Sequence, residues 1–154
     1  MLVNPVGIEI MRTTAIRDRV DEIVSAVEDA MSRVEAVIVT GGLGPTNDDI
    51  TKITLCKLFG GKMVFSQATQ DNNDALFAKH GKEMNSLTRS QAMVPDCCKV
   101  LPNVVGTAPG MIFKRDGKML ISLPGVPYEM QKLIDDSILP FTELQKLLNQ
   151  FGYT

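Results

Sequence analysis

The sequence predicts an α/β domain built as a three-layer, mostly parallel sheet, with helices on both faces and a small β-hairpin. A strand pattern, a helix pattern and a second strand pattern follow one another between residues 7 and 39, which is the order of a parallel βαβ unit. The second strand pattern, 36–39, is continuously apolar, as in a parallel strand buried on both faces. Asp116-Gly117, between two apolar runs, is typical of a hairpin turn.

Composition limits the possible classes of function. The chain has 154 residues, which predicts a single domain over 1–154. A net charge of −2 gives no reason to expect nucleic-acid binding, and no apolar run approaches the roughly 18 residues of a membrane helix. Three cysteines, two of them adjacent, make a poor disulfide framework and indicate a reducing cytoplasm. A single histidine argues against zinc.

The first elements follow from hydrophobic periodicity. Residues 7–16 are expected to form a strand, because Ile8 and Ile10 alternate with polar residues. Residues 17–32 are expected to form a helix, because apolar residues recur at three- and four-residue spacing from Val20 to Met31. The crossover between this strand and the strand at 36–39 should be right-handed.

Turn and cap residues delimit the remaining elements. A helix is expected over 49–59, begun by the capping-box spacing of Thr46 and Asp49 and ended by Gly60. Ser66 should open the next helix and Gly81 should close it. The other expected elements are strands at 62–65, 98–101 and 111–114 and helices at 85–92, from 128 onward, and 140–151.

The segment TGGLGPTNDDIT at 40–51 carries the strongest chemical signal. It lies between an expected strand and an expected helix, where glycines bring backbone amides close to a ligand and the helix start favours an anion. Asp48 and Asp49 would suit a divalent cation that bridges to phosphate oxygens. The segment lacks the dinucleotide and Walker patterns. The alternative interpretation is a plain strand-to-helix turn capped by Asp49.

Two further segments have the small and rigid residues of ligand-binding loops. NVVGTAPG at 103–110 contains small residues and polar side chains that would let a ligand approach the backbone. It is equally consistent with an ordinary connection before the hairpin. LPGVP at 123–127, followed by Glu129, is a stiff turn that also preorganises the start of a helix.

The strings GGLGPTNDDIT, NVVGTAPGM and LPGVPYEM, in this order, resemble the amino-terminal domain of the CinA family of competence/damage-inducible proteins. The resemblance extends from about Gly7 to about Leu144. More distantly, the chain is similar to domains that bind molybdopterin. The resemblance therefore implies the molybdopterin-binding-like fold.

The resemblance also implies an activity and a site. It implies hydrolysis of ADP-ribose at its pyrophosphate with a divalent metal, magnesium first, by Asp49 and Asp18, with Asp48 and Asp49 as metal ligands. Asp18 also has a plain interpretation as a first-turn acid favoured by the helix dipole. The ligand-binding residues that it implies are Gly41, Gly42, Gly44, Thr46, Thr51, Asn103, Gly106, Pro109, Gly110, Pro124, Gly125 and Pro127.

Other functions stay open. The domain could bind molybdopterin, another pterin phosphate or a nucleotide without turnover, or act as an inactive fragment that associates with a partner subunit. A homo-oligomer is expected. We expect solvated charge, rather than a phosphate contact, from Arg12, Arg17, Arg19 and Lys52, and a surface or capping role for His80.

The chain departs from the family pattern at its start. The first strand–helix unit of the family, with its GDELLxG-like loop, is not found, and the chain begins about where the second strand would. We therefore expect an incomplete domain with exposed strand edges.

Overall fold

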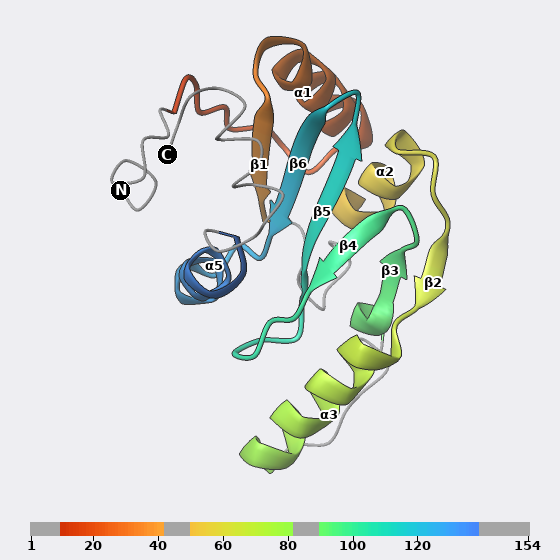
Figure 1. The fold of residues 1–154 in the computed structure, drawn as a ribbon, viewed down its shortest axis with the longest axis vertical. Helices are drawn as coiled ribbons and strands as arrows, with labels where there is room; N and C mark the ends of the chain where they lie inside the picture. Colours follow the sequence, from red (N-terminus) through yellow and green to blue (C-terminus); the bar gives the residue numbers. More distant parts are fainter. Residues whose placement is uncertain (1–9, 42–49, 82–89, 139–154) are drawn as a thin grey trace.

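The computed structural model describes residues 10–41, 50–81 and 90–138 (Figure 1). Its helices are α1 (Val20–Arg33), α2 (Ile50–Leu58), α3 (Gln67–His80) and α5 (Pro127–Leu133), with a 3-10 turn at Ser90–Ala92 and a π turn at Ile134–Ile138. Its strands are β1 (Ala36–Thr40), β2 (Met63–Phe65), β3 (Met93–Pro95), β4 (Cys98–Leu101), β5 (Gly110–Arg115) and β6 (Lys118–Leu123).

The main sheet has four strands in the order β1-β6-β5-β4. β1 pairs with β6 in parallel, whereas β6–β5 and β5–β4 are antiparallel. β2 and β3 form a separate antiparallel pair. The α/β class is confirmed, and the sheet in the described part is mixed rather than mostly parallel.

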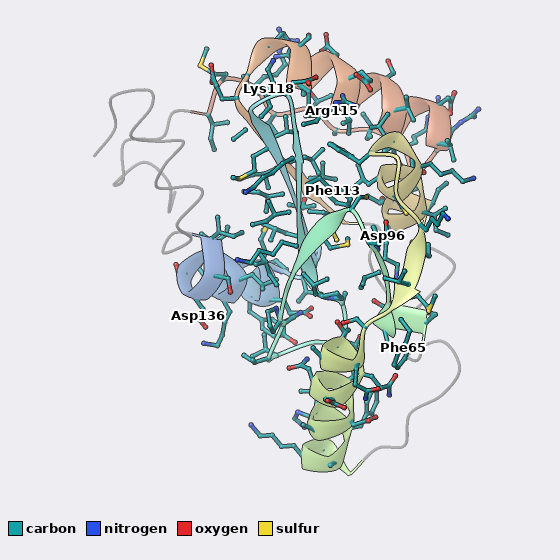
Figure 2. The ribbon with its side chains drawn as sticks, turned by 45° about the vertical axis from the view of Figure 1, so that its right-hand side comes forward. Phe65, Asp96, Phe113, Arg115, Lys118 and Asp136 are labelled. Carbon is teal, nitrogen blue, oxygen red and sulfur yellow. The ribbon has the colours of Figure 1, made fainter. Side chains whose placement is uncertain are left out.

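Helices cover both faces of the main sheet, as the sequence predicts. On one face, α1 and α2 contribute Ile23, Val27, Met31 and Leu55 to a core with Phe113 of β5. The Phe113 ring lies 4.9 Å from that of Phe59 and is enclosed between sheet and helices (Figure 2). On the other face, α5 and the π turn pack Leu133 and Ile138 against the sheet.

The hairpin and the caps of α3 are confirmed. Asp116 and Gly117 have φ values of 54° and 74°, the two positive values that a tight hairpin turn requires. Ser66 caps α3, because its hydroxyl accepts a hydrogen bond from the Thr69 amide at 3.2 Å. Gly81 ends α3 with a φ of 65°.

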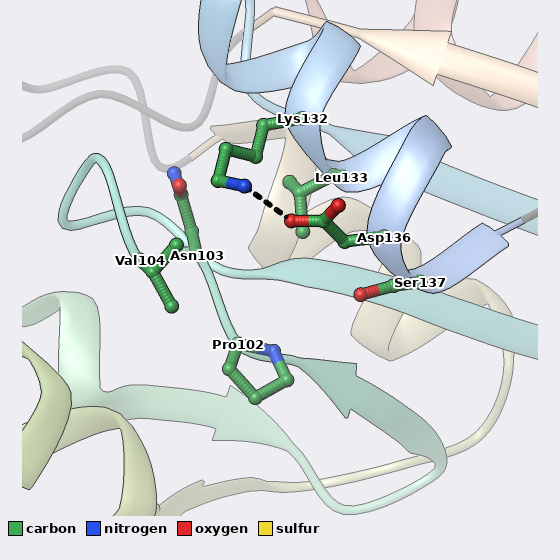
Figure 3. Close-up of a pocket in the computed structure, with 7 residues that line it drawn as sticks. All are labelled: Pro102, Asn103, Val104, Lys132, Leu133, Asp136 and Ser137. Atoms are coloured by element: carbon green, nitrogen blue, oxygen red, sulfur yellow. Dashed lines mark hydrogen bonds and ion pairs between the residues drawn. The ribbon is translucent and has the colours of Figure 1, made fainter.

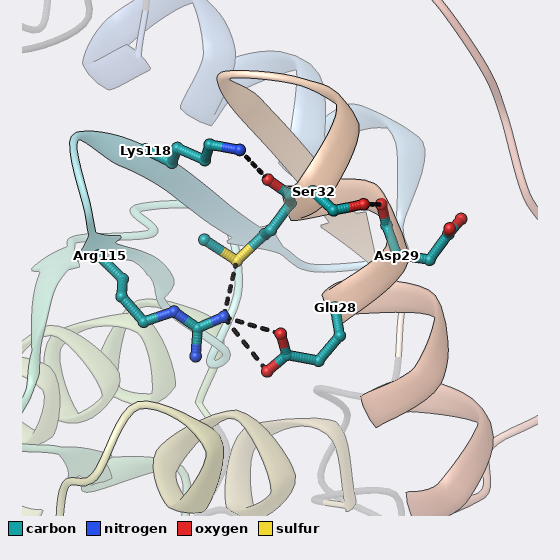
Figure 4. A network of polar contacts seen from close by, with 6 residues as sticks. Glu28, Asp29, Ser32, Arg115 and Lys118 are labelled. Atoms are coloured by element: carbon teal, nitrogen blue, oxygen red, sulfur yellow. Dashed lines mark hydrogen bonds and ion pairs between the residues drawn. The ribbon is translucent and has the colours of Figure 1, made fainter.

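Polar contacts fasten the hairpin to α1 (Figure 4). Arg115 lies 3.1 Å from the Glu28 carboxylate, and its guanidinium stacks 5.1 Å from the centre of the Phe59 ring. Lys118 donates a hydrogen bond to the Met31 carbonyl near the end of α1. These contacts hold α1 over the hairpin end of the sheet.

Two expectations in the first part of the chain are wrong. Residues 10–16, the described part of the expected strand 7–16, form no strand and are exposed. A strand needs a partner for its backbone groups, and no described strand pairs with this segment. The expected βαβ unit is therefore not formed in the described residues, and α1 begins at Val20 rather than at Arg17.

β1 also differs from its expected burial. It was expected to be buried on both faces, but it is an edge strand in which residues 36, 38 and 40 are exposed and residues 37 and 39 half-buried. Ile38 is 49% exposed.

Some expectations fall wholly or partly outside the described residues. The helix at 140–151 and the capping pair Thr46 and Asp49 lie there. Of the helix expected at 85–92, only the 3-10 turn at Ser90–Ala92 is described. No helix in the ranges 10–41, 50–81 and 90–138 is long and apolar enough to cross a membrane.

Candidate functional site

The carboxyl ends of β1 and β6 bring the first and third predicted loop segments together. The two strands are parallel, so both end at the same edge of the sheet. The Gly41 amide donates a hydrogen bond to the Leu123 carbonyl at 3.3 Å. A Cβ on Gly125 would lie 3.2 Å from the Gly41 Cα, tighter than most real contacts. The close contact therefore explains the glycine at 125, whereas Gly41 is favoured by its backbone conformation, with a φ of +96°.

The second segment is closed by a buried polar network. Asn103 is buried, and its amide nitrogen donates to the Ala108 carbonyl at 2.9 Å and to the Glu129 carboxylate at 2.8 Å. Its side-chain oxygen accepts from the Val105 amide at 3.2 Å. Glu129 is only 7% exposed, so its carboxylate is held by α5 against the loop. The network joins the second and third segments.

Gly106 lies directly against this carboxylate. A Cβ at Gly106 would lie 1.5 Å from Glu129 Oε1, which no side chain could tolerate without displacing Glu129. Pro109 and Gly110 are buried, and Gly110 begins β5 opposite Leu101. The loop is further tied to α3, because the Asn72 amide donates to the Asn103 carbonyl at 2.7 Å.

Buried polar residues line the first turn of α2, which follows the glycine-rich segment. Thr51 is buried, and Lys52 is only 3% exposed with its ammonium 3.2 Å from the Ser90 carbonyl. The expectation that Lys52 is a solvated charge is therefore wrong. Lys52 precedes the buried residues Leu55 and Cys56 by three and four positions, a spacing that places it on the same face of the helix. This spacing could have predicted its burial from the sequence.

The other predicted site residues divide into three groups. Gly42, Gly44, Thr46, Asp48 and Asp49 lie outside the described residues. Pro124 is buried, whereas Gly125 and Pro127, the first residue of α5, are exposed at the strand ends. Asp18 is exposed before α1, and none of the described contacts joins it to the strand-end glycines.

A shallow pocket lies beside the second segment (Figure 3). It is lined by Pro102, Asn103, Val104, Lys132, Leu133, Asp136 and Ser137. Lys132 and Asp136 form an ion pair at 2.6 Å, so its charged groups neutralise each other. The backbone amides near the strand-end glycines are therefore a better candidate binding site for an anion than this pocket.

Residues 1–144 match the family model described as "Probable molybdopterin binding domain". The chain belongs to this family. It is 46% identical over 133 residues to a CinA-like protein of Cytophaga hutchinsonii, and 39% identical over 137 residues to a putative competence-damage inducible protein of Caldicellulosiruptor saccharolyticus. These alignments cover 86% and 89% of this chain but 32% and 33% of the two relatives, so the chain spans about a third of their length.

Solved structures agree with this membership. The crystal structure of the protein CinA with unknown function from Thermoplasma acidophilum matches with a TM-score of 0.73 and 33% identity, over 87% of this chain and 78% of that one. A molybdopterin biosynthesis protein from Mycobacterium abscessus matches with a TM-score of 0.59 and 14% identity, over 97% and 79%. The second match supports the fold alone. The resemblance to CinA stated from the three motifs is confirmed.

The three cysteines of this CinA-like domain are free thiols that are buried or half-buried. No group of three histidine, cysteine, aspartate or glutamate side chains within the described ranges could hold a metal ion. Burial, with smaller effects from nearby Cys97, Cys56 and Asp96, raises the pKa of Cys98 to about 12. Burial also raises the pKa values of Cys56 and Cys97.

We expect these thiols to react slowly with a disulfide reagent in the native domain. The thiolate is the reactive form, and a raised pKa leaves little of it at pH 8. Cys98, with the pKa of about 12, should be the slowest. Timed labelling with Ellman's reagent, followed by mass mapping, measures the three rates, and labelling in urea gives the unfolded control. Native labelling of Cys98 as fast as in urea would contradict this burial.

Proposed function

We propose that this CinA-like domain binds a phosphate-containing small molecule at the carboxyl ends of β1 and β6 and hydrolyses the pyrophosphate of ADP-ribose with a divalent metal. One observation carries the proposal: Gly125 packs so closely on Gly41 that a Cβ added to Gly125 would lie 3.2 Å from the Gly41 Cα. This contact joins the glycine-rich segment to the proline–glycine turn. Ligands of open α/β folds bind in crevices outside the carboxyl ends of strands.

Residues of the three loop segments would bind the phosphates, position the second loop and hold the metal. Glycines at 42 and 44 would present backbone amides to the phosphates, while Gly41, whose amide is bonded to the Leu123 carbonyl, would turn the chain toward them. Asn103 with Glu129 would keep the second loop in one conformation. Asp48 and Asp49 would hold the metal, since carboxylate oxygens are the ligands that magnesium prefers. A bound divalent cation would supply positive charge to the phosphoryl oxygens. Water would attack one phosphorus and the bridging P–O bond would break, giving AMP and ribose 5-phosphate.

Binding without turnover is the second candidate, and the state of Glu129 favours it. Among the described residues, Glu129 is the carboxylate that contacts the loop segments. It is buried and accepts a hydrogen bond from Asn103. It is therefore poorly placed to take a proton from water. In this case the domain would hold a nucleotide or a pterin phosphate such as molybdopterin.

Melting the domain with ADP-ribose and magnesium separates the candidates. Ligand at 100 times its dissociation constant should stabilise the native state by about 2.7 kcal/mol. We expect this shift, together with AMP release, in the unmodified chain, and loss of both with Asp49→Asn. Asp71→Asn, an exposed aspartate of α3, is the matched control and should keep both.

Each result has a distinct reading. A shift without AMP would reject hydrolysis and leave the binding module. A melt that ADP-ribose, pyrophosphate and a pterin phosphate all leave unmoved would reject both candidates. An Asp49→Asn variant that still releases AMP with magnesium would remove Asp49 from the metal site.

A further inference from the structure

Three exposed apolar side chains belong to the loop segments beside the candidate site. Val104 is 56% exposed, Val126 is 42% exposed and Tyr128 is 64% exposed. Val104 lies in the second segment, whereas Val126 lies in the third segment and Tyr128 follows it at the start of α5. Ligand sites are lined mainly by apolar and aromatic side chains, so an exposed aromatic ring in this place needs an explanation.

The buried Asn103–Glu129 hydrogen bond brings Val104 and Tyr128 close together. Val104 directly follows Asn103, Tyr128 directly precedes Glu129, and the two bonded atoms are 2.8 Å apart. Asn103 and Glu129 are buried, whereas the side chains next to them are exposed. Val104 and Tyr128 therefore border one stretch of surface between the second loop and the first turn of α5.

The shallow pocket continues this surface along α5. Val104 of the loop and Lys132 of α5 both line it (Figure 3). Tyr128 lies four residues before Lys132, and residues four apart on a helix are neighbours on the same side. The ion pair between Lys132 and Asp136, at 2.6 Å, neutralises both charges. This surface therefore suits an uncharged ring better than it suits a phosphate.

A rigid turn connects Tyr128 to the glycines at the strand ends. Gly125, three residues before Tyr128, packs against Gly41. Pro127, immediately before Tyr128, is the first residue of α5, and its ring fixes φ. The Tyr128 backbone is therefore held at a set position beside the proposed phosphate site.

We propose that Tyr128 selects ligands that carry a heteroaromatic base, because its ring stacks on the base while the strand-end glycine segment binds the phosphates. Val104 would contact the same base from the second loop. The proposal rests on the proposed phosphate binding and adds the residue that distinguishes a nucleotide from a plain pyrophosphate. Every base has a face that can stack, so the class selected is a nucleoside diphosphate derivative such as ADP-ribose, with no requirement for adenine itself.

Isothermal titration with two matched ligands tests the stack. The first is the methylene analogue of ADP-ribose, in which CH2 replaces the bridging oxygen and prevents hydrolysis, and the second is methylenediphosphonate, which has the same bridge and no base. With magnesium present, Tyr128→Ala should weaken binding of the analogue by about 5- to 100-fold, the range expected for the loss of one base–aromatic stack. Its affinity for methylenediphosphonate should stay unchanged.

Two variants provide the controls. Tyr128→Phe keeps the aromatic ring and should bind the analogue within about twofold of the unmodified chain. Phe65→Ala removes an exposed aromatic ring from β2 and should leave both affinities unchanged. Tyr128 is exposed, so all three variants should fold.

The outcomes separate this proposal from the proposed function. A Tyr128→Ala variant that binds the analogue as tightly as the unmodified chain would reject the stack and leave phosphate binding intact. Equal losses for both ligands would also reject it, because Tyr128 would then support the phosphate site and not the base. An unmodified chain that binds neither ligand would overturn the proposed function, and the stack with it.

Tyrosine fluorescence gives a direct readout of the contact. The chain has two tyrosines and no tryptophan, so Tyr153→Phe leaves Tyr128 as the only strong emitter. A base stacked on this ring should quench its emission in proportion to the bound fraction, after correction for absorption by the base. Methylenediphosphonate should cause no quenching. Unquenched emission at saturation with the analogue would overturn the proposal.

Discussion

Phe113→Ala is expected to lower the free energy of unfolding by about 3–5 kcal/mol, the cost of removing a large aromatic side chain from a packed core. Phe113 is fully buried between the main sheet and the α1–α2 layer, and its ring contacts that of Phe59. Truncation would remove apolar contacts and leave a cavity that the surrounding strands cannot close. Urea denaturation followed by far-UV circular dichroism measures the loss.

Phe65 is the matched control for this change. It lies on β2 and is 55% exposed, so Phe65→Ala should alter the unfolding free energy by less than about 1 kcal/mol. A Phe113→Ala variant as stable as Phe65→Ala would show that the two-sided packing of the main sheet is not the stabilising core.

Asn103→Ala should cost about 3 kcal/mol, because it leaves the buried Glu129 carboxylate without its hydrogen-bond donor. It also removes the bonds that Asn103 makes with the Ala108 carbonyl and the Val105 amide. The loop at 103–110 should loosen, so binding at the strand ends should weaken along with stability. Chemical denaturation gives the first effect and ligand-induced melting shifts give the second.

A double-mutant cycle with Glu129→Leu isolates the contact. Once the carboxylate is gone, the loss of Asn103 should cost less, and the coupling should be at least about 1 kcal/mol. Asn72→Ala removes a neighbouring bond to the same loop and provides a control that leaves the carboxylate paired. Additive effects of the two changes would mean that the Asn103–Glu129 bond does not hold the loop.

Local patterns in the sequence were sufficient to predict the elements with strong turn or cap residues. The hairpin turn at Asp116 and Gly117 depends on the backbone preferences of these two residues and not on where the hairpin lies in the fold, so it is predictable from the sequence. Ser66 and Gly81 likewise cap the two ends of α3 through local interactions that the sequence alone reveals. The segments at 103–110 and 123–127 connect described strands and helices as the sequence predicts, although their contacts were not predicted, whereas residues 42–49 of the first segment lie outside the described residues.

The failures concern pairing, which a single strand cannot encode. Residues 10–16 alternate as a strand should, but strand structure requires a neighbour. The run at 36–39 has the composition of a doubly buried strand, whereas its burial depends on what lies beyond its free edge. β3 was missed because it has only three residues and ends in Pro95.

The site residues show the same limit. Gly106 was predicted as a ligand-binding glycine, yet the contact that requires glycine there is with Glu129, which lies far along the chain. Lys52 was judged by its charge, although its position among buried residues of α2 decides its burial. Contacts between distant segments cannot be read from local spacing.

The parallel pairing of β1 with β6 has a consequence for how the chain folds. β4, β5 and β6 follow one another as an antiparallel meander whose contacts are local, so this part should form early. Ala36, by contrast, pairs with Met119. At about 5–20 residues per second, a ribosome delivers β6 several seconds after β1. A newly made β1 therefore waits for β6 with its backbone groups unpaired, and chaperones or other nascent chains can bind it during this interval.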